Sequence, residues 1–569
     1  MAVQYEGGGK DELKTHFQIR EGTYKLMTLS EYSRPNRVGY NTQATTPVKV
    51  SFVTIPDQSG NGDRICFNVG RELYIYMYKG VRKAADLTKP IDKRVYKGTH
   101  PTCHDFNNVT VTGEGVSLLV GFSAGQIQLV DPIRKELTKL YNEERLIDKT
   151  KVTCLKWLPG SPNQFLVSHV SGQMYVYNEE LPCGTTPPHY QIFKQGEGFA
   201  VYTCKTKSTR NPLYRWVIGE GALNEFEFSP CSKYLATVSQ DGFLRVFNYD
   251  TMDLLGIARS YFGGLLCVCW SPDGRYVVSG GEDDLVTVWS FNERRIVARG
   301  HGHKSWISVV AFDPYTTWCS DLESFDFSGS DEEELTNQHM PSNHTEFLDS
   351  DNSSSKHTSH MSNSSTSRPT SNRNSSESRT VNITSYRFGS VGQDTQLCLW
   401  DLTEDVLKQP LGRTRTSVVF SQSGSQTNKC SNQTGNSQAN CVVKDLVADG
   451  NVVHSSSSLT HKFATLTLVG EKKEKYDKEH KRNFSLTSRN SEKNTVLKSS
   501  SKVIDDPVKI IGTLSCPRLD DVPMLEPLVC KKITHERLTA LVFREDCIVT
   551  ACQEGLIATW ARPGKVVGS

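Results

Sequence analysis

The sequence lacks an excess of charge of either sign and lacks any long apolar run. Its 569 residues carry 65 Lys and Arg against 63 Asp and Glu, a formal net charge of +2, so we expect no general attraction to nucleic acid or to an acidic membrane surface. No stretch reaches the roughly 18 consecutive apolar residues of a membrane-spanning helix. Hydrophobic residues make up 37% of the chain, too few for every segment to belong to a folded core.

Paired cysteine motifs and a secretory signal are also missing. None of the 16 Cys residues forms a C-x-x-C pair, and residues 1–25 contain no apolar stretch of the kind that directs secretion. We therefore expect a soluble, intracellular protein in a reducing compartment.

The sequence contains little that points to catalysis. Residues 219–224, Gly-Glu-Gly-Ala-Leu-Asn, break the dinucleotide-binding fingerprint at its third Gly, and no G-x-x-x-x-G-K phosphate loop occurs. No group of His and Cys has the spacing of a zinc site. These absences predict a protein that is not an enzyme and that needs no cofactor and no metal ion.

What the sequence does contain is an internal repeat. In its clearest unit, strands are expected at 265–270, 276–280 and 285–289, with turns at 271–274 and 282–284. Apolar side chains fall at every second position, and turn residues separate the runs. This pattern is typical of an antiparallel meander with one face buried against a neighbour.

Six further segments repeat the second turn and the third strand of this unit. The aligned column of the seven copies falls at Tyr76, Val130, Tyr177, Phe247, Trp289, Trp400 and Trp560. The successive spacings are 54, 47, 70, 42, 111 and 160 residues, so a module of about 42 to 50 residues is interrupted by insertions.

Two of these insertions are long, rich in Ser and Asn, and unable to bury enough apolar area to fold. The remainder gives about 52 residues for each of seven modules, the size of a propeller blade. The predicted fold is all-β: a seven-bladed propeller with long disordered insertions in blade 6. The expected segments are a flexible N-terminus (1–20), blades 1–5 and the start of blade 6 (21–317), a disordered Ser-rich insertion (318–384), more of blade 6 (385–405), a disordered insertion with a short apolar island at 459–469 (406–524), and the end of blade 6 with blade 7 (525–569).

The repeat resembles the WD40-repeat propellers. In that family a His, a Ser or Thr, an Asp and a Trp form a buried hydrogen-bonded tetrad in each well-formed blade. The resemblance implies a structural tetrad of His303, Ser390, Asp394 and Trp400 in blade 6; of His535, Thr550, Glu554 and Trp560 in blade 7; and of Ser279, Asp283 and Trp289, without a His, in blade 5. We expect these residues to be scaffold rather than catalytic, and residues 21–27 to close the ring as the last strand of blade 7.

The three largest insertions, at 318–384, 406–524 and roughly 179–210, follow first or third strands and should leave from one rim. The opposite, tetrad-side rim keeps short loops and is expected to bind a partner. Its candidate partner-binding residues are Phe262, Trp306, Tyr261 and Lys304. Phe262 and Trp306 are either exposed anchors or aromatic side chains that pack locally under their loops.

Five segments resemble one branch of the family more closely: SEYSRPNR at 30–37, DQSGNGD at 57–63, KGVRKAAD at 79–86, SYFGGLL at 260–266 and GHGHKSW at 300–306. This resemblance implies a non-catalytic scaffold and activator of a deubiquitinase complex. The implied partners are ubiquitin-specific proteases 12 and 46 and a second WD40 subunit. The alternatives are a substrate receptor of a cullin-RING ubiquitin ligase, although Trp400-Asp-Leu-Thr403 lacks the Arg of the W-D-x-R motif, or a phosphopeptide-binding propeller.

The insertions carry short motifs. The spacing of Leu459, Phe463, Leu466 and Leu468 resembles a leucine-rich nuclear export signal, which predicts binding to an exportin and shuttling between cytoplasm and nucleus; the same island also reads as an edge strand. Ser residues in 328–334 and at Ser485 lie in kinase-like contexts, so the chain is expected to be a phosphoprotein.

Overall fold

The computed structural model describes residues 13–33, 46–57, 60–204, 209–320, 382–408 and 510–565. These residues belong to one compact unit made of 1–414 and 505–569. The export-like motif at 459–468 and the kinase-like motifs at 328–334 and 482–485 lie outside the described residues.

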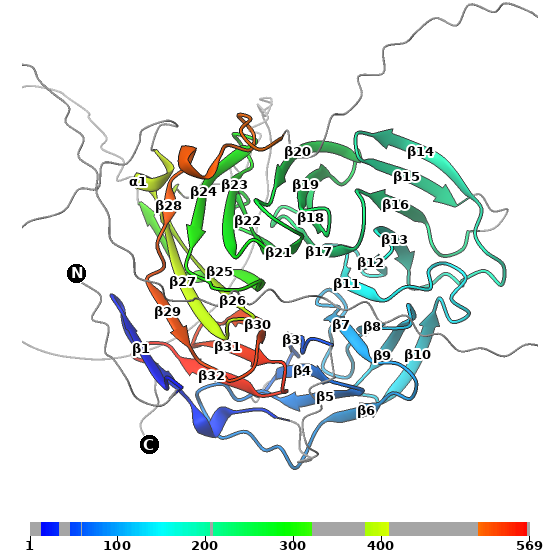
Figure 1. Cartoon of the computed structure of the whole chain (residues 1–569). Helices are drawn as coiled ribbons and strands as arrows, with labels where there is room; N and C mark the ends of the chain where they lie inside the picture. Colours follow the sequence, from blue (N-terminus) through cyan, green and yellow to red (C-terminus); the bar gives the residue numbers. More distant parts are fainter. Residues whose placement is uncertain are drawn as a thin grey trace, which may run out of the picture. The chain divides into compact units, whose positions relative to one another are not determined.

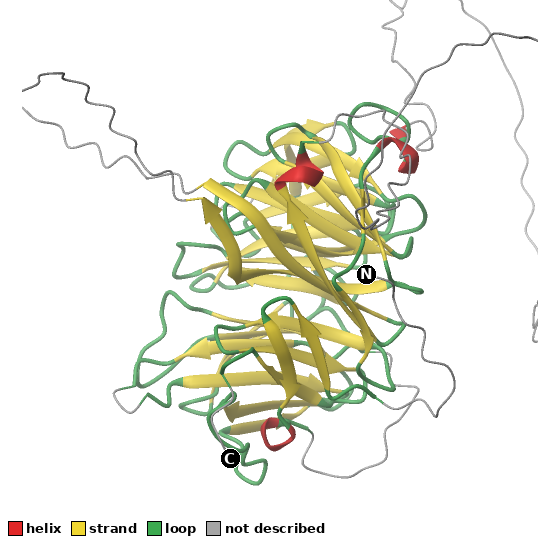
Figure 2. Ribbon diagram, turned by 90° about the vertical axis from the view of Figure 1, so that its left-hand side faces the viewer, coloured by secondary structure: helices red, strands yellow, loops and turns green. Residues whose placement is uncertain are grey.

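Strands make up nearly all of the regular secondary structure in the described residues, and the helical turns are short (Figure 2). In the described residues the strands form seven sheets, which are the blades of a β-propeller (Figure 1). The short helices are η1 (Thr28–Ser30), α1 (Glu404–Leu407) and η3 (Leu519–Asp521). In the same residues, no helix has the length and apolar character needed to cross a bilayer.

Blades 1, 2 and 4 are four-stranded antiparallel meanders, each running from an inner first strand to an outer fourth strand. Their strands are β3 (Val50–Thr54), β4 (Asp63–Val69), β5 (Glu72–Met77) and β6 (Asp92–Val95); β7 (Pro101–Phe106), β8 (Leu118–Phe122), β9 (Ile127–Asp131) and β10 (Glu136–Tyr141); and β17 (Leu223–Phe228), β18 (Tyr234–Ser239), β19 (Phe243–Asn248) and β20 (Asp253–Arg259).

Blades 3 and 5 are built in the same way but gain further strands, whereas blade 6 keeps four strands. Blade 3 consists of β11 (Val152–Trp157), β12 (Gln164–His169), β13 (Gln173–Asn178) and β16 (Tyr214–Ile218), extended outward by β15 (Phe199–Cys204) and β14 (Tyr190–Gly196). Blade 5 consists of β21 (Leu265–Trp270), β22 (Tyr276–Gly281), β23 (Leu285–Ser290) and β24 (Arg295–His301), extended by β28 (Met524–Leu525). Blade 6 consists of β25 (Ile307–Ser320), β26 (Asn382–Gly392), β27 (Gln396–Thr403) and β29 (Val529–Lys532).

Blade 7 joins the two ends of the chain. It consists of β30 (Leu538–Phe543), β31 (Cys547–Cys552) and β32 (Ile557–Ala561), followed by β2 (Gly22–Leu26) and β1 (His16–Ile19). Leu26 pairs with Trp560 and Lys25 with Ala561, which confirms that residues 21–27 close the ring. This pairing hides the edge of β32 that would otherwise be open.

The blades are held together by apolar side chains that alternate along each strand and pack against the next sheet. Between blades 5 and 6, for example, Val288 and Cys267 share one buried cluster with Phe312, Phe388 and Trp400. The third-strand aromatics that revealed the repeat are therefore core residues.

The structure differs from the expected segments in two places: within the N-terminal segment 1–20 and at the end of the second insertion. β1 lies within 1–20, because Phe17, 2% exposed, packs on Tyr24 and Trp560. Residues 510–524 are also ordered: β28 pairs in parallel with β24, and Cys516 and Val522 are buried in the core cluster of blade 5. A few apolar residues in a polar stretch were enough to fix these segments, although their overall composition predicted disorder.

Blade 6 also extends further than expected, since β25 runs to Ser320 and β26 begins at Asn382. The three insertions connect β25 to β26, β27 to β29, and β13 to β16. Because consecutive strands run antiparallel, all three connections leave from the same rim. The other rim, here called the tetrad rim, carries the blade-to-blade connections and the turns between second and third strands.

Candidate functional site

The tetrad rim is organised in blade 6 by four buried side chains. His303 Nδ1 lies 3.1 Å from both carboxylate oxygens of Asp394, and His303 Nε2 lies 2.7 Å from Ser390 Oγ. Trp400 Nε1 donates to the same Ser390 Oγ at 2.8 Å. Since Asp394 only accepts, the imidazole proton belongs on Nδ1, and Nε2 accepts from the serine hydroxyl. The structure thus brings together the four residues expected for this tetrad.

Burial and the tetrad contacts act in opposite directions on the pKa of Asp394. Burial alone would raise the pKa of this carboxyl group, but its hydrogen bond and charge attraction to His303, with the amide donors of Lys304 and Gln396, hold the pKa below its ordinary value. An ionised Asp394 therefore anchors the loop that follows His303.

This anchored loop presents Trp306. The Lys304 N–H donates to Asp394 Oδ2 at 2.8 Å, and the Gln393 N–H donates to the Trp306 carbonyl at 2.9 Å. The backbone is thereby fixed on both sides, while the Trp306 side chain is 42% exposed and Lys304 is exposed.

The equivalent loop of the preceding blade presents Phe262. The Tyr261 N–H donates to Asp283 Oδ2 and the Gly264 N–H donates to Glu282 Oε2, both at 2.8 Å. Gly263 has a φ of +63°, and a Cβ added to it would lie 2.5 Å from Glu282 Oε2, so only glycine fits there. The loop is held by its main chain, and the Phe262 side chain is 73% exposed.

The two loops flank one acidic turn, residues 282–284, of blade 5. Glu282 and Asp283 accept from the Phe262 loop, whereas Asp284 interacts electrostatically with Asp394 and His303 on the other side. Burial, and then the negative charge of Asp394, raise the pKa of Asp284. The exposed side chains on these loops, here called the aromatic patch, are Tyr261, Phe262, Lys304 and Trp306.

Blade 5 lacks the histidine, as the sequence suggested. Ser260 occupies the position of His303, because the next backbone N–H binds the turn carboxylate in both blades. Its hydroxyl donates to the Gly263 carbonyl. Ser279 Oγ and Trp289 Nε1 are buried without a hydrogen-bond partner, so the loop of blade 5 relies on Asp283 and Glu282 rather than on a tetrad.

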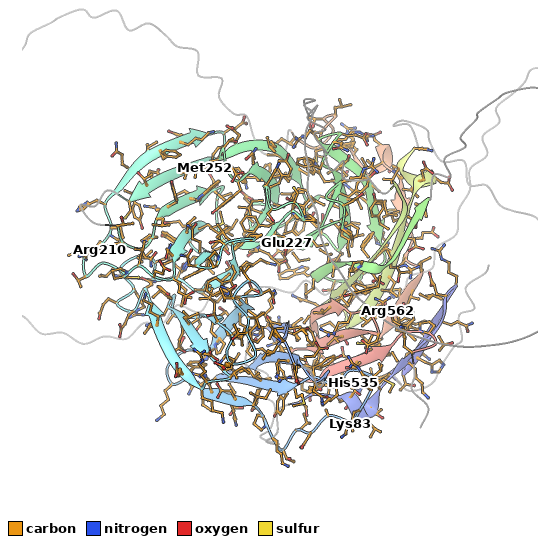
Figure 3. All side chains as sticks on the ribbon, turned by 180° about the vertical axis from the view of Figure 1, so that it is seen from behind. Lys83, Arg210, Glu227, Met252, His535 and Arg562 are labelled. Carbon is orange, nitrogen blue, oxygen red and sulfur yellow. The ribbon has the colours of Figure 1, made fainter. Side chains whose placement is uncertain are left out.

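The tetrad expected in blade 7 is not formed. Trp560 Nε1 donates to Thr550 Oγ1 at 3.1 Å, but His535 (labelled in Figure 3) and Glu554 are exposed. The residue four positions before the first strand, where His303 stands in blade 6, is Thr534, which is buried and donates to the Glu536 carbonyl. A one-residue offset therefore directs His535 outward, and Glu554 has no imidazole to bind.

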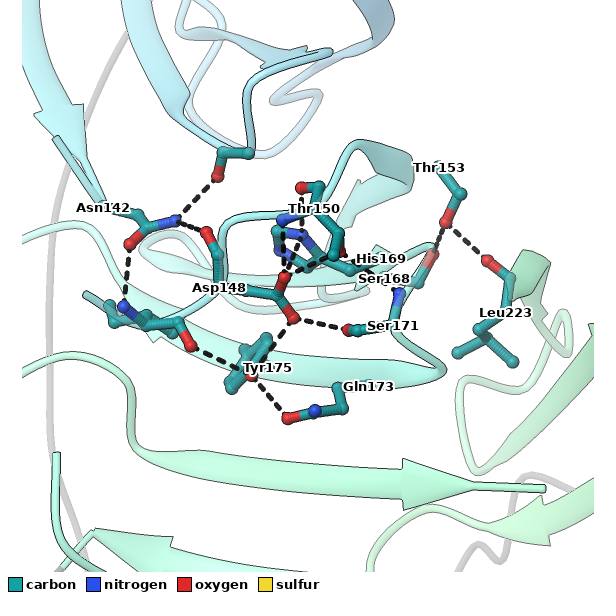
Figure 4. A network of polar contacts seen from close by, with 12 residues as sticks. Asn142, Asp148, Thr150, Thr153, Ser168, His169, Ser171, Gln173, Tyr175 and Leu223 are labelled. Carbon is teal, nitrogen blue, oxygen red and sulfur yellow. Dashed lines mark hydrogen bonds and ion pairs between the residues drawn. The ribbon is translucent and has the colours of Figure 1, made fainter. Parts of the chain in front are cut away.

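Blade 3 contains a polar network that the tetrad pattern did not predict from the sequence. Asp148, four residues before β11, accepts from Thr150 Oγ1 at 2.6 Å and from the Tyr175 hydroxyl at 3.3 Å. The Ser171 hydroxyl also donates to it, and Figure 4 shows these contacts together. His169 Nδ1 lies 3.7 Å from Asp148 Oδ1. Asp148 stands at the position of His303, and Ser171 stands at the position of Asp394, two residues before the third strand, whereas His169 is the last residue of β12. A search for His before the first strand could not find this network.

The centre of the tetrad rim opens into a small cavity of about 210 Å³. Its lining comes from the starts of the first strands of all seven blades and includes Lys49, Lys151 and Arg537. Deeper in, Lys156 pairs with Glu227, which Figure 3 places near the centre of the ring. Burial raises the pKa of Asp105 to about 6. In the described residues, no group of three His, Cys, Asp or Glu side chains is placed to hold a metal ion.

The family comparisons agree with this architecture. The model of the WD domain, G-beta repeat, matches residues 216–248 and 258–290. Mouse WD repeat-containing protein 20 is 57% identical over 583 aligned residues, covering 100% of this chain and 99% of the mouse protein. The WD repeat-containing protein 20 homolog of Caenorhabditis elegans is 38% identical, covering 98% of this chain and 84% of that protein. With identity of this extent from the first blade to the last, the chain belongs to the WD repeat-containing protein 20 family of WD40 propeller scaffolds.

Proposed function

We propose that this chain is a non-catalytic scaffold and allosteric activator of a deubiquitinase complex, with ubiquitin-specific proteases 12 and 46 and a second WD40 subunit as its partners. The aromatic patch on the tetrad rim is the proposed docking site. The observation that carries this proposal is the pair of exposed aromatic side chains, Phe262 at 73% and Trp306 at 42%, held on adjacent, backbone-anchored loops.

Physical reasoning supports a binding role for this patch. Large aromatic side chains dominate the energetics of protein interfaces. Here their loops are already fixed by hydrogen bonds to Glu282, Asp283 and Asp394, so little backbone entropy is lost when a partner binds. The three insertions leave from the opposite rim, which keeps the patch accessible.

The proposed mechanism is a population shift. A cysteine protease whose active-site loops sample inactive arrangements gains turnover if a partner binds the competent arrangement more tightly. The propeller contributes no reacting group in this mechanism and needs no cofactor. Activation should raise the catalytic rate constant more than it changes the affinity for ubiquitin substrates.

The proposal is tested with purified components and a fluorogenic ubiquitin reporter. The wild-type chain should increase hydrolysis by each protease, whereas the Phe262→Ala and Trp306→Ala chains should bind and activate less. Unchanged hydrolysis on adding the folded wild-type chain would refute the proposal. Capture of a cullin-4 ligase in place of the proteases would instead favour the alternative of a ligase substrate receptor. Capture of phosphopeptides that does not depend on the aromatic patch would favour the alternative of a phosphopeptide-binding propeller.

We further propose that the protein shuttles between cytoplasm and nucleus, and that an exportin binds the apolar motif Leu459, Phe463, Leu466 and Leu468. Inhibiting the exportin should cause nuclear accumulation of the wild-type chain. A chain with Leu466 and Leu468 changed to Ala should accumulate without the inhibitor. An unchanged distribution in both experiments would contradict this proposal.

A further inference from the structure

Two cysteine side chains face each other across blade 6. Cys398 lies on β27 and Cys530 lies opposite it on β29. Both are free thiols, and their sulfur atoms are 3.3 Å apart. Cys398 is fully buried, whereas Cys530 is partly exposed. The function proposed above uses neither residue.

The backbone holds the two cysteines at a spacing that suits a disulfide bond. The Ile533 N–H donates to the Thr395 carbonyl at 3.1 Å, which makes these two residues a hydrogen-bonded pair of the ladder. Since hydrogen-bonded and non-hydrogen-bonded pairs alternate, Cys398 and Cys530 form a non-hydrogen-bonded pair. The Cα atoms of such pairs are about 4.5 Å apart, inside the range of about 4.4–6.8 Å that disulfides adopt. A bond between them requires no movement of either strand.

We propose that Cys398 and Cys530 form a reversible disulfide and are an oxidative modification site of blade 6. The oxidant is a low-molecular-weight disulfide, for which glutathione disulfide is the probe. The Cys530 thiol releases its proton to water, and the thiolate attacks one sulfur of this oxidant, forming a mixed disulfide and releasing one glutathione thiolate. That thiolate takes up the proton of Cys398. The Cys398 thiolate then attacks the Cys530 sulfur, the mixed disulfide breaks, and the second glutathione leaves as a thiolate that takes up a proton from water.

The surroundings of the two thiols assign their order of reaction. Cys530 is the accessible one, and a hydrogen bond from the Cys398 thiol lowers its pKa below the ordinary thiol value. Burial and the negative charge of Asp394 oppose this shift, and the charges of Lys304 and Lys531 support it. The same hydrogen bond and burial raise the pKa of Cys398. Thiolates are the nucleophiles in exchange, so Cys530 reacts first and Cys398 resolves the mixed disulfide.

Oxidation changes a hydrogen-bond chain that reaches the tetrad. In the reduced protein the Cys530 thiol donates to Gln396 Oε1 at 2.8 Å, and Gln396 Nε2 donates to Asp394 Oδ2 at 2.9 Å. The same carboxylate oxygen accepts from the Lys304 N–H. In the disulfide neither sulfur carries a hydrogen, so Gln396 loses the group that fixes its carbonyl oxygen. The hydrogen bond from the Lys304 N–H to Asp394 should therefore weaken.

The full-length protein treated with glutathione disulfide tests this inference. Peptide mapping without reductant should find the peptides of Cys398 and Cys530 joined, with a mass lower by two hydrogen atoms, and a thiol reductant should separate them. Cys231 is exposed and serves as the internal control, since it should retain a glutathione adduct. In Cys398→Ser, Cys530 should also retain its adduct because no resolving thiol is present.

Two results would contradict the proposed disulfide. One is a wild-type protein in which Cys530 keeps its glutathione adduct beside a free Cys398; the other is a pair that stays reduced while Cys231 is modified. Both are read from the wild-type chain, so the test holds even if Cys398→Ser fails to fold. Amide hydrogen exchange at Lys304 should rise several-fold in the linked protein, and unchanged exchange would overturn the coupling to the tetrad. Neither readout depends on the proposed protease partners.

Discussion

Arg562 and Asp313 form a bidentate ion pair that ties blade 7 to blade 6. The guanidinium Nη1 and Nη2 atoms lie 2.8 and 2.7 Å from the two carboxylate oxygens, and both side chains are nearly buried. Burial would lower the pKa of Arg562, but the hydrogen bonds and charge of Asp313 raise it. Arg562 also donates to the Thr316 hydroxyl and, more weakly, to that of Tyr24. The first residue after β32 therefore connects three separate parts of the chain.

Removing this arginine should destabilise the propeller strongly. Arg562→Met leaves Asp313 as a buried charge without its cation, a change that costs about 3–5 kcal/mol. Arg295→Met is the matched control, because the Glu293 partner of Arg295 is 45% exposed and such surface pairs contribute about 0–1 kcal/mol. Urea unfolding followed by tryptophan fluorescence measures both. Equal midpoints for the two variants would show that the Asp313 pair does not hold the blades together.

The N-terminal strand β1 should also contribute to stability. Phe17 stacks on Tyr24 with ring centroids 4.9 Å apart and contacts Trp560 at 5.6 Å. Replacing a buried Phe by Ala costs about 3–5 kcal/mol. Phe17→Ala should lower the thermal midpoint, whereas Ala at the neighbouring exposed His16 should leave it unchanged. A Phe17→Ala chain as stable as the wild type would mean that the contacts of Phe17 with Tyr24 and Trp560 do not stabilise the propeller.

Two adjacent residues of β7 should make opposite contributions to the pH dependence of stability. Burial lowers the pKa of His104 from 6.5 to about 4 and raises that of Asp105 from 3.8 to about 6. Between pH 4 and 6.5 the unfolded chain binds more protons at His104, so this residue reduces stability as the pH falls. Over pH 3.8 to 6 the folded chain binds more protons at Asp105, so this residue increases stability as the pH falls. The two contributions should nearly cancel in the wild type.

Substitution separates these contributions. In Asp105→Asn only the His104 contribution remains. Relative to the wild type, the free energy of unfolding should therefore fall by up to about 1.4 kcal/mol per pH unit as the pH is lowered from 6 to 3.8. In His104→Gln the sign should reverse, with the stability relative to the wild type rising as the pH is lowered from 6.5 to 4. Urea unfolding at half-unit pH steps measures both slopes. Parallel pH profiles for the wild type and both variants would contradict the assigned shifts.

The repeat made most of the propeller predictable from sequence. Trp289, Trp400 and Trp560 recur at the same place in the blade because the third strand must fill the same space each time. The blade 6 tetrad could be read across a long insertion because each of its residues keeps a fixed distance from a strand end. Closure by residues 21–27 followed from the need to cover an open edge.

Other features had no signal of this kind. In blade 3 Asp148 stands where blade 6 has His303, and its imidazole partner His169 lies at the end of β12, a position that the tetrad pattern does not include. His535 lies one residue from the position that a tetrad requires. Pairing of β28 with β24 depends on a contact between residues more than 200 positions apart, which no local pattern encodes. The contact between Cys398 and Cys530 likewise appears only once β27 and β29 are paired.

The aromatic patch should account for much of the affinity for the proposed protease partners. Truncating Phe262 or Trp306 to Ala should weaken binding by about 2 kcal/mol, or roughly 30-fold in Kd. Because both side chains already face solvent, the thermal midpoint should stay at the wild-type value. Phe193→Ala is the matched control, since Phe193 is 59% exposed but lies on β14, the outer strand of blade 3. Calorimetric titration measures all three variants against the wild type. If Phe193→Ala lost as much affinity as the patch variants, the docking site would have to lie on the outer edge of blade 3 as well, and the assignment to the tetrad rim would be wrong.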